Sequence, residues 1–443
     1  MPLAAHAAGK IRVNKKNRFG ARLALPALIA AILAPAAHAA GFQLSEQSIV
    51  GLGRAHAGAG VAGDDLSSVF YNPAGMVLHR GTQIQGGLTY AEIDAPFEGD
   101  NSFYLSGARS GTNNGRGPGE VIPQGFLIKE INERTRFGFG VTVPFGLGSS
   151  YGDDWFGRNH GIEAHIMTVD FNPSLAYQLD EQWSIGGGVS AQYAKAKLKQ
   201  GAFFPGASGE IDADSWAFGY NLGVMYQFDA DTRVGLSYRS KLQHDAEGDY
   251  TAQGFDKFLG GLKIDGVYDG AASVTTPESV LLSAYHRVNP KLALTGSLRW
   301  SNWSRFDKLT IEGNPLSDTT IDNNWKGSWF ASVGADYSYS DKLTLRGGVG
   351  YETSPVPDAE HRNPLIPDRD RVWLSVGGSY ALEKNMTLDV GYTYLLGVGD
   401  DKIDHTVMSP ATPGKPNGNP DTLKGKYNSI TGHLIGVGLQ YRF

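Results

Sequence analysis

The chain has 443 residues, of which 41% are hydrophobic, and a formal net charge of −6. It contains no cysteine, which excludes disulfides, cysteine-ligated metals and a cysteine nucleophile. Its mean hydropathy of −0.26 excludes a bundle of apolar membrane helices.

The first forty residues have the three parts of a secretory signal peptide. Six Lys and Arg residues, with no acidic residue, precede an apolar run over 23–37, which ends in the small residues Ala37-His38-Ala39-Ala40. The run is shorter than the roughly 20 residues that a membrane helix needs. We expect residues 1–40 to be removed. The mature chain then has 33 Lys and Arg against 45 Asp and Glu, a net charge of −12 that disfavours nucleic-acid partners.

Residues 41–80 are rich in Gly and Ala and show no regular alternation. They precede the first alternating segment. A barrel of about fourteen strands is wide enough to need filling. If the rest of the chain closes such a barrel, we expect residues 41–80 to fill it as a plug; a loose periplasmic arm is the alternative.

From residue 81 onward the chain alternates with a period of two. At 216–228 the even positions are large and apolar, from Trp216 to Phe228, and the odd positions are small or polar. This period is typical of strands with one apolar face. Fourteen such segments lie near 81–91, 121–130, 134–145, 165–179, 183–199, 213–228, 232–248, 274–288, 291–312, 319–339, 342–352, 370–382, 385–397 and 430–443.

The connections between these segments alternate between short and long. Six are short turns, such as Asn289-Pro290, and seven are long, polar loops, such as 91–120, 146–164 and 398–429. This alternation is typical of an outer-membrane barrel with both termini in the periplasm. We therefore predict an all-β protein, a transmembrane antiparallel β-barrel of about fourteen strands over 81–443, in the outer membrane of a Gram-negative bacterium. The terminal Phe443 fits this class.

The third alternating segment contains the signs of a break in the wall. It carries Gly138, Gly140 and Pro144. Proline cannot donate to the sheet ladder and is confined to edges or irregularities. We expect the strand to leave the ladder between Gly138 and Pro144, facing Asn72–Ala74; the alternative is that Pro144 ends the strand.

Several motifs, in order along 41–443, resemble those of the FadL family of outer-membrane transporters. They are Gly41-Phe42-Gln43-Leu44-Ser45-Glu46, Gly51-Leu52-Gly53-Arg54-Ala55, Asp64-Asp65, Asn72-Pro73-Ala74, Tyr238-Arg239-Ser240, Trp303-Ser304-Arg305-Phe306, Ser354-Pro355-Val356-Pro357-Asp358 and Ile366-Pro367-Asp368-Arg369-Asp370-Arg371. The resemblance implies a barrel with an N-terminal plug marked by Asn72, Pro73 and Ala74. It implies passive uptake of long-chain fatty acids or, in other relatives, aromatic hydrocarbons. Substrate would be captured in outer loops, held beside the plug, and released sideways at a kink in the third strand.

The resemblance also implies binding residues. Lys195 and Lys326 match positions that hold a carboxylate, although Lys195 has the parity of the lipid face of its strand. Phe42 and loop residues Phe203 and Phe204 are candidates for tail contacts. A fourth-loop set at helical spacing predicts a short amphipathic helix and consists of Phe255, Phe258, Leu259 and Leu262. The third outer loop, near 200–212, is short.

Other functions have weaker signals. Gly58-Ala59-Gly60-Val61-Ala62-Gly63 matches G-x-G-x-x-G but has no βαβ context. The sequence predicts no cofactor, no metal and no catalytic residues. An outer-membrane lipolytic enzyme, and a general porin or adhesin, are the alternatives. We expect a monomer in contact with outer-membrane lipid and lipopolysaccharide.

Overall fold

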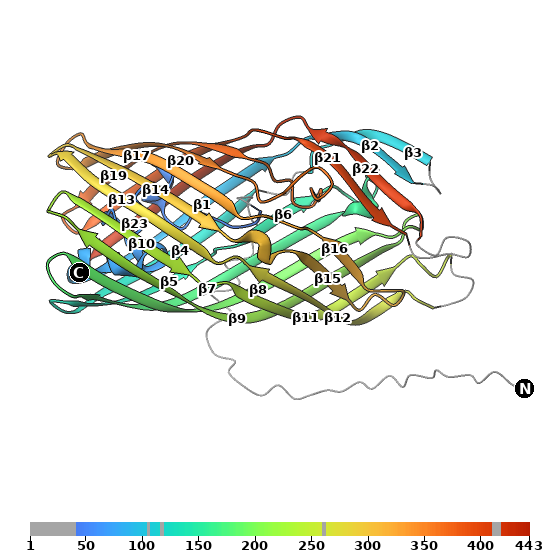
Figure 1. Cartoon of the computed structure of the whole chain (residues 1–443), viewed down its shortest axis with the longest axis horizontal. Coiled ribbons are helices and arrows are strands. Elements are labelled where there is room, and N and C mark those ends of the chain that lie inside the picture. The colour runs from blue at the N-terminus through green and yellow to red at the C-terminus, as the bar shows by residue number, and fades with distance from the viewer. Residues whose placement is uncertain (1–40, 104–106, 116–118, 259–262, 410–417) are drawn as a thin grey trace, which may run out of the picture. The chain divides into compact units, whose positions relative to one another are not determined.

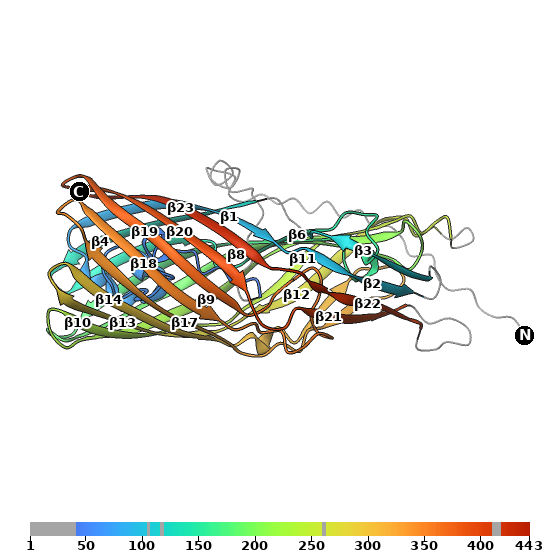
Figure 2. The ribbon, with the colours of Figure 1, turned by 90° about the horizontal axis from the view of Figure 1, so that it is seen from above.

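The computed structural model describes residues 41–103, 107–115, 119–258, 263–409 and 418–443; the predicted signal peptide lies outside these ranges. The main sheet, seen from two sides in Figures 1 and 2, contains nineteen strand segments. They are β1 (Thr82–Asp94), β4 (Glu120–Asn132), β5 (Thr135–Thr142), β6 (Gly146–Ser150), β7 (Glu163–Gln178), β8 (Trp183–Gly201), β9 (Ser208–Gln227), β10 (Thr232–Arg239), β11 (Leu242–Gln253), β12 (Gly266–Thr276), β13 (Ser279–Asn289), β14 (Leu292–Ser301), β15 (Lys308–Glu312), β16 (Thr319–Asp322), β17 (Ser328–Ser338), β18 (Leu343–Glu352), β19 (Arg371–Glu383), β20 (Met386–Gly397) and β23 (Thr431–Arg442).

The barrel wall has fourteen strand positions, because five positions contain two consecutive segments each. These are β5/β6, β10/β11, β12/β13, β14/β15 and β16/β17. The ladder closes on itself, since β1 pairs with β4 on one edge and with the last strand β23 on the other. The prediction of an antiparallel barrel of about fourteen strands is confirmed.

Large apolar side chains point away from the barrel. On β9, Phe218 is 72% exposed, whereas Ala217, one position earlier, is buried. The same contrast repeats around the wall, because alternate residues of a strand face opposite sides. The outer surface is therefore apolar where the sequence pattern predicts a lipid-facing band. Within the described ranges, no helix is long and apolar enough to cross a membrane.

Aromatic rings mark the two edges of this band on β8 and β9. Tyr193 lies beside Trp216 with ring centroids 5.5 Å apart, and Trp183 lies beside Tyr226 at 4.7 Å. Ten positions of β8 separate the two levels. At about 3.3 Å per residue this is about 33 Å along the strand. A strand tilt of about 40° reduces it to roughly 25 Å along the barrel axis, the height of an outer-membrane apolar band.

One end of the barrel, which we call the turn end, has short connections and the C-terminus (Figure 1). The opposite loop end has a second sheet, in the order β21-β22-β2-β3. Its strands are β2 (Phe97–Phe103), β3 (Gly107–Asn113), β21 (Lys402–Met408) and β22 (Pro420–Tyr427). The sequence pattern predicted irregular loops over 91–120 and 398–429. These loops form strands because each edge finds a partner in the other loop, with Phe97 opposite Tyr427.

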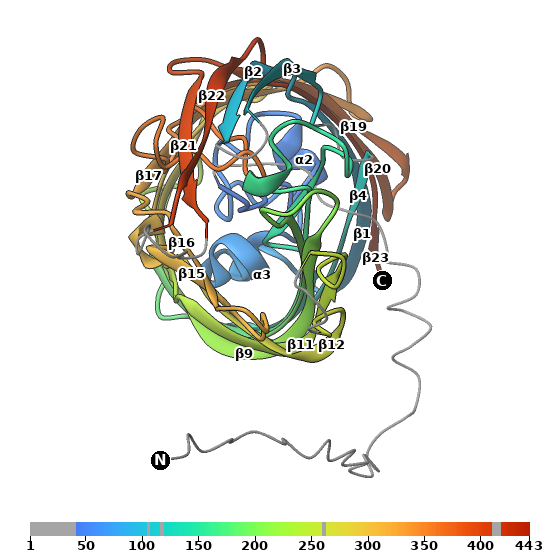
Figure 3. The ribbon, with the colours of Figure 1, turned by 90° about the vertical axis from the view of Figure 1, so that its right-hand side faces the viewer.

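Residues 41–80 lie inside the ring of wall strands (Figure 3). They form α2 (Ile49–Leu52), α3 (Ser68–Tyr71) and the 3-10 turn η1 (Pro73–Leu78). Apart from Gly63 and Arg80, every residue of the segment is buried or half-buried. The wall approaches it closely through glycine, since a Cβ on Gly348 would stand 2.3 Å from the carbonyl oxygen of Arg54. We call residues 41–80 the inner segment.

Candidate functional site

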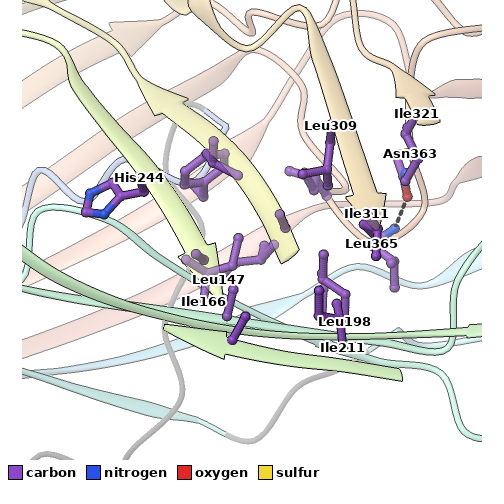
Figure 4. Close-up of a pocket in the computed structure, with 18 of the residues that line it drawn as sticks. Leu147, Ile166, Leu198, Ile211, His244, Leu309, Ile311, Ile321, Asn363 and Leu365 are labelled. Atoms are coloured by element: carbon purple, nitrogen blue, oxygen red, sulfur yellow. Dashed lines mark hydrogen bonds between the residues drawn. The ribbon is translucent and has the colours of Figure 1, made fainter. Parts of the chain in front are cut away.

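An apolar cavity of about 100 Å³ lies inside the loop end of the barrel (Figure 4). Its walls consist of the small and aliphatic side chains at the strand positions that face inward. The main wall residues are Ala164 and Ile166 of β7, Ala194, Ala196 and Leu198 of β8, Ile211 and Ala213 of β9, Ala246 of β11, Ala272 and Val274 of β12, and Leu309 and Ile311 of β15. Among the described lining residues, Lys199 is the one charged side chain, and it pairs with Asp153 at 2.6 Å. The cavity therefore suits a hydrocarbon.

Phe42, near the start of the inner segment, is one of the residues lining the cavity. Its ring packs edge-on against Trp303 and Phe306, with centroids 4.8 and 5.4 Å away, and also against Phe145 and Trp325. Phe42 is 1% exposed. The predicted contact residue Phe42 thus joins the cavity to the wall and to the inner segment.

The loop before β19 holds Gly41, the residue that precedes Phe42. Asp368 is buried, forms an ion pair with Arg371 and accepts a hydrogen bond from the Ser354 hydroxyl at 2.6 Å. Burial raises the pKa of Asp368 to about 6, and Arg371, Ser354 and the backbone N–H of Gly41 act in the opposite direction. The start of the inner segment is therefore anchored to the loop end by a carboxylate.

The third wall strand is interrupted at Pro144. β5 ends at Thr142 and β6 begins at Gly146, and the inner segment supplies hydrogen bonds between them. The Leu44 N–H donates to the Pro144 carbonyl at 2.8 Å, and the Gly146 N–H donates to the Phe42 carbonyl at 2.9 Å. The Gln47 side chain bonds both backbone groups of Val143. Residues 42–47 therefore occupy the break from the inside.

The break leaves two strand edges apart. On β4, residues 120–124 pair with β1, and pairing with β5 begins only at Gly125. In the described part of the chain β6 pairs with β7 and not with β4. Gly138 and Gly140 stay in the regular ladder, opposite Ile128 and Phe126 of β4. The predicted interruption exists, but it begins after Thr142 rather than at Gly138.

The Asn72-Pro73-Ala74 motif lies elsewhere. The Asn72 amide donates to the Val224 carbonyl of β9 at 3.2 Å, and the Ser184 hydroxyl of β8 donates to the Ala74 carbonyl. A Cβ on Gly186 of β8 would stand 2.5 Å from the Pro73 carbonyl carbon. The motif itself does not face the break at Pro144, although Val69 and Met76, on either side of it, pack against Gly138 of β5. The glycines of β8 and β9 admit the motif beside those two strands, and the break is occupied by residues 42–47.

A cluster of buried charges joins the inner segment to the wall. Arg54 bonds Asp64 of the same segment at 2.5 Å and Asp336 of β17 at 2.6 Å. Arg346 of β18 bonds both carboxylates, at 3.2 and 3.4 Å. Removing one partner from such a cluster leaves a buried charge uncompensated. The cluster therefore holds the inner segment in place.

Neither predicted lysine reaches the cavity. Lys195 points outward from β8 and pairs with Asp212 of β9 at 3.1 Å, and both side chains are 46% exposed. The β8–β9 register is continuous from Trp183 to Gly201, so no bulge turns Lys195 inward. Lys326 is exposed, while its neighbour Trp325 is buried beside Phe42. Neither lysine is therefore placed to hold a head group in the cavity, because strand parity directs Lys195 outward and the buried Trp325 directs Lys326 away from it.

The predicted loop aromatics gather above the cavity. Phe204 stacks on Phe258 at 5.5 Å and lies 6.3 Å from Phe255. Phe203, Phe204 and Phe255 line a second cavity of about 750 Å³, which we call the vestibule. Residues 255–258 form a turn, and Leu259 and Leu262 lie outside the described residues.

Sequence reasoning missed most of the cavity wall and all of the polar groups above it. His160 contacts His405 and Asp421, which both lie in the C-terminal part of the chain. His160 was visible as a loop histidine, but no local spacing connects it with residues 245 and 261 positions later. The cavity wall could have been predicted from the alternate positions of β7, β8 and β9 that face inward, because these positions carry small or aliphatic residues.

A closed fourteen-strand barrel, an outer apolar band of membrane height and an internal apolar cavity define an outer-membrane transport protein for hydrophobic compounds. The family model described as "Outer membrane protein transport protein (OMPP1/FadL/TodX)" matches residues 30–443. The chain belongs to this family, and the predicted resemblance is confirmed.

Relatives agree with this assignment. The chain is 31% identical over 413 residues to the long-chain fatty acid transport protein of Escherichia coli (strain K12), covering 84% of this chain and 91% of that protein. It is 31% identical over 427 residues to outer membrane protein P1 of Haemophilus influenzae, covering 86% and 91%. The crystal structure of a Pseudomonas aeruginosa FadL homologue superposes with a TM-score of 0.81 at 26% identity, covering 91% of this chain and 100% of that one.

Proposed function

We propose that the protein is a passive channel that admits molecules with long hydrocarbon tails, such as long-chain fatty acids, through the outer membrane. The apolar cavity beside Phe42 carries the proposal. Each buried methylene contributes roughly 0.8 kcal/mol, so the tail supplies most of the affinity. The Escherichia coli relative, named for long-chain fatty acid transport, supports this substrate class.

The proposed orientation places the turn end and both termini in the periplasm and the loop end outside the cell. The mature chain starts near Gly41, and the inner segment acts as a plug. In this arrangement the protein is a monomer surrounded by outer-membrane lipid and lipopolysaccharide, and it carries out no reaction on its substrate.

The proposed route runs from the vestibule to the apolar cavity and then through the wall. Phe42 touches both the cavity and the break, so movement of residues 42–47 would connect the two. A molecule would then leave between β4 and β6 into the membrane. The unpaired edge of β4 above Gly125 and the occupied break at Pro144 support this route.

Binding of a chain-length series tests the proposal. We expect the dissociation constant of saturated fatty acids to fall with each added methylene, approaching fourfold per methylene where the tail is fully buried. Lys326→Ala should change these constants less than twofold, because Lys326 points away from the cavity. Isothermal titration of the purified protein measures the dissociation constants of the chain-length series and the effect of Lys326→Ala on them. Length-independent binding, or release of a chemically altered ligand, would favour a porin or a lipolytic enzyme.

A channel for monoaromatic hydrocarbons is the second candidate. The aromatic side chains around Phe42 and a cavity of about 100 Å³ favour a single ring. In the same titration, toluene binding as tightly as a long acyl chain would select this candidate.

We expect the Arg54 cluster to determine how firmly the plug is held. Arg54→Met leaves Asp64 and Asp336 without their main cation, which costs about 3–5 kcal/mol for a buried pair. We expect the plug to open transiently and the ion conductance of single channels in planar bilayers to rise several-fold. Arg80→Met, at the exposed end of the same segment, is the control and should keep wild-type conductance. Equal conductance in all three proteins would show that the cluster does not hold the plug.

A further inference from the structure

The vestibule is lined by carboxylates and not by cations. Asp318, Asp322, Glu360 and Asp404 line it, and its described lining residues include no Lys or Arg. Asp322 pairs with Lys308 at 3.1 Å and Asp404 with Lys424 at 2.9 Å, and these pairs are exposed. Counted over the described residues, two lysines near four carboxylates leave the entrance negative. A negatively lined recess repels anions and lowers their local concentration.

The vestibule and the apolar cavity share a polar neck. His160, Gln200, Tyr250 and Asn363 line both spaces, so a molecule whose tail enters the cavity leaves its head group at this level. Asn363 appears at the edge of the cavity in Figure 4. The chemistry of the neck therefore selects the head group.

A buried carboxylate fixes the direction of the hydrogen bonds at the neck. Asp421 is fully buried and accepts from the Asn101 and Asn159 amides, each at 2.7 Å, and from His160 Nε2 at 3.2 Å. Burial raises the pKa of Asp421, but the interaction with His160 and the hydrogen bonds from Asn159 and Asn101 outweigh burial and hold the pKa below its usual value. An ionised carboxylate only accepts, so His160 donates through Nε2.

His405 continues this chain into the vestibule. Its Nδ1 lies 2.9 Å from Nδ1 of His160. Burial, with a smaller effect of His160, lowers the pKa of His405 to about 3, so its imidazole is neutral. A neutral imidazole has one donating and one accepting nitrogen, and Nδ1 of His405 is used by His160, so Nε2 of His405 remains for a head group that can both donate and accept. His405 is among the residues lining the vestibule.

We infer that the preferred substrate is an uncharged molecule with a hydrocarbon tail and a hydroxyl head group, rather than a fatty-acid anion. This inference rests on the proposed function, because it concerns the head group of a molecule whose tail occupies the cavity. A hydroxyl both donates and accepts, so it can hydrogen-bond Nε2 of His405. A carboxylate meets the acidic vestibule, and among the described residues lining the two spaces it finds one Lys or Arg, Lys199, which is already paired.

Two ligands of equal tail length test the inference: 1-decanol and decanoate, at pH 7.5, with the purified full chain. We expect decanol to bind about fourfold more tightly, since two net unit charges about 10 Å away in high dielectric repel an anion to about that extent. The association rate of decanoate should rise with ionic strength as the repulsion is screened, and that of decanol should stay constant. Tighter binding of decanoate, or a decanoate rate that falls with salt, would overturn the inference. Failure of both ligands to bind would instead overturn the proposed function.

Variants separate the contribution of the vestibule carboxylates from that of His405. The double variant Asp318→Asn, Glu360→Gln should raise decanoate affinity several-fold and leave decanol unchanged. Asp358→Asn, an exposed acid in the same loop that does not line the vestibule, is the matched control. His405→Phe should weaken decanol several-fold and decanoate little, and His405→Gln, which keeps an acceptor, should restore decanol binding. Unchanged decanoate affinity in the double variant, or equal weakening of both ligands by His405→Phe without rescue, would contradict the assignment.

Discussion

Deletion of Pro144 is expected to reduce uptake at least tenfold while the barrel still folds. Thr142 stands opposite Asp170 of β7, and Gly146 stands opposite Met167. Three residues therefore lie between these pairs on the third strand, where β7 has two. One extra residue makes a bulge, which bends the strand and leaves the ladder locally unpaired. Without Pro144 the two counts match, and β6 continues the register of β5 beside β4.

The burial pattern supports this reading of the bulge. Inward positions are even on β5, as at Gly140 and Thr142, and odd on β6, as at Leu147 and Ser149. Removing one residue keeps Leu147 and Ser149 inward while restoring the alternation. The closed ladder would also displace residues 42–47 from the break.

Uptake of a labelled long-chain fatty acid by cells measures the effect, and heat-modifiable migration on gels reports folding. Pro144→Ala is the matched control, because it keeps the extra residue and so the bulge, and it should retain most of the uptake. Wild-type uptake by the deletion variant, with a folded barrel, would exclude exit between β4 and β6.

Much of the fold follows from patterns that are local in sequence. The period of two on β9 and the alternation of short and long connections require no knowledge of distant partners. Pro144 also marked the interruption correctly, because a missing backbone donor is a property of the residue itself. The segment that occupies the break was not predictable in this way, since residues 41–80 have no alternation and are positioned by wall glycines and by the Arg54 cluster.

Lys195 shows which of two kinds of inference is more reliable for a side chain. Its parity with Val189 and Tyr193 predicted an outward direction, while the family resemblance pointed to a carboxylate ligand. The structure agrees with parity, because the β8–β9 ladder has no bulge that would reverse the face. A resemblance aligns positions, but the direction of a side chain depends on the register of its own strand.

The loop end was the least predictable part. The strands β2 and β22 pair across more than 300 positions of sequence, and each is too polar to be predicted as a strand from its own residues. The contact of His160 with His405 and Asp421 depends on that pairing. Residues that meet only through tertiary pairing show no recognisable spacing in the sequence, so the vestibule is not predictable from sequence alone.

Filling the apolar cavity with Ala272→Trp is expected to weaken binding of a long-chain ligand about 100-fold. Ala272 lines the cavity, which has a volume of about 100 Å³, and an indole ring would exclude several methylenes of the tail. Loss of about four methylenes at roughly 0.8 kcal/mol each amounts to about 3 kcal/mol, which is more than a factor of 100 in the dissociation constant.

The preceding residue supplies the control for this substitution. Ala271 has the opposite parity on β12 and does not line the cavity, so Ala271→Trp adds the same ring to the outer face. It should leave affinity within about twofold of wild type. Isothermal titration with one fatty acid and with its shorter homologues compares the three proteins. Because the indole removes space for the tail, Ala272→Trp should also flatten the dependence of affinity on chain length. Similar affinities in the two tryptophan variants would mean that the tail binds outside this cavity.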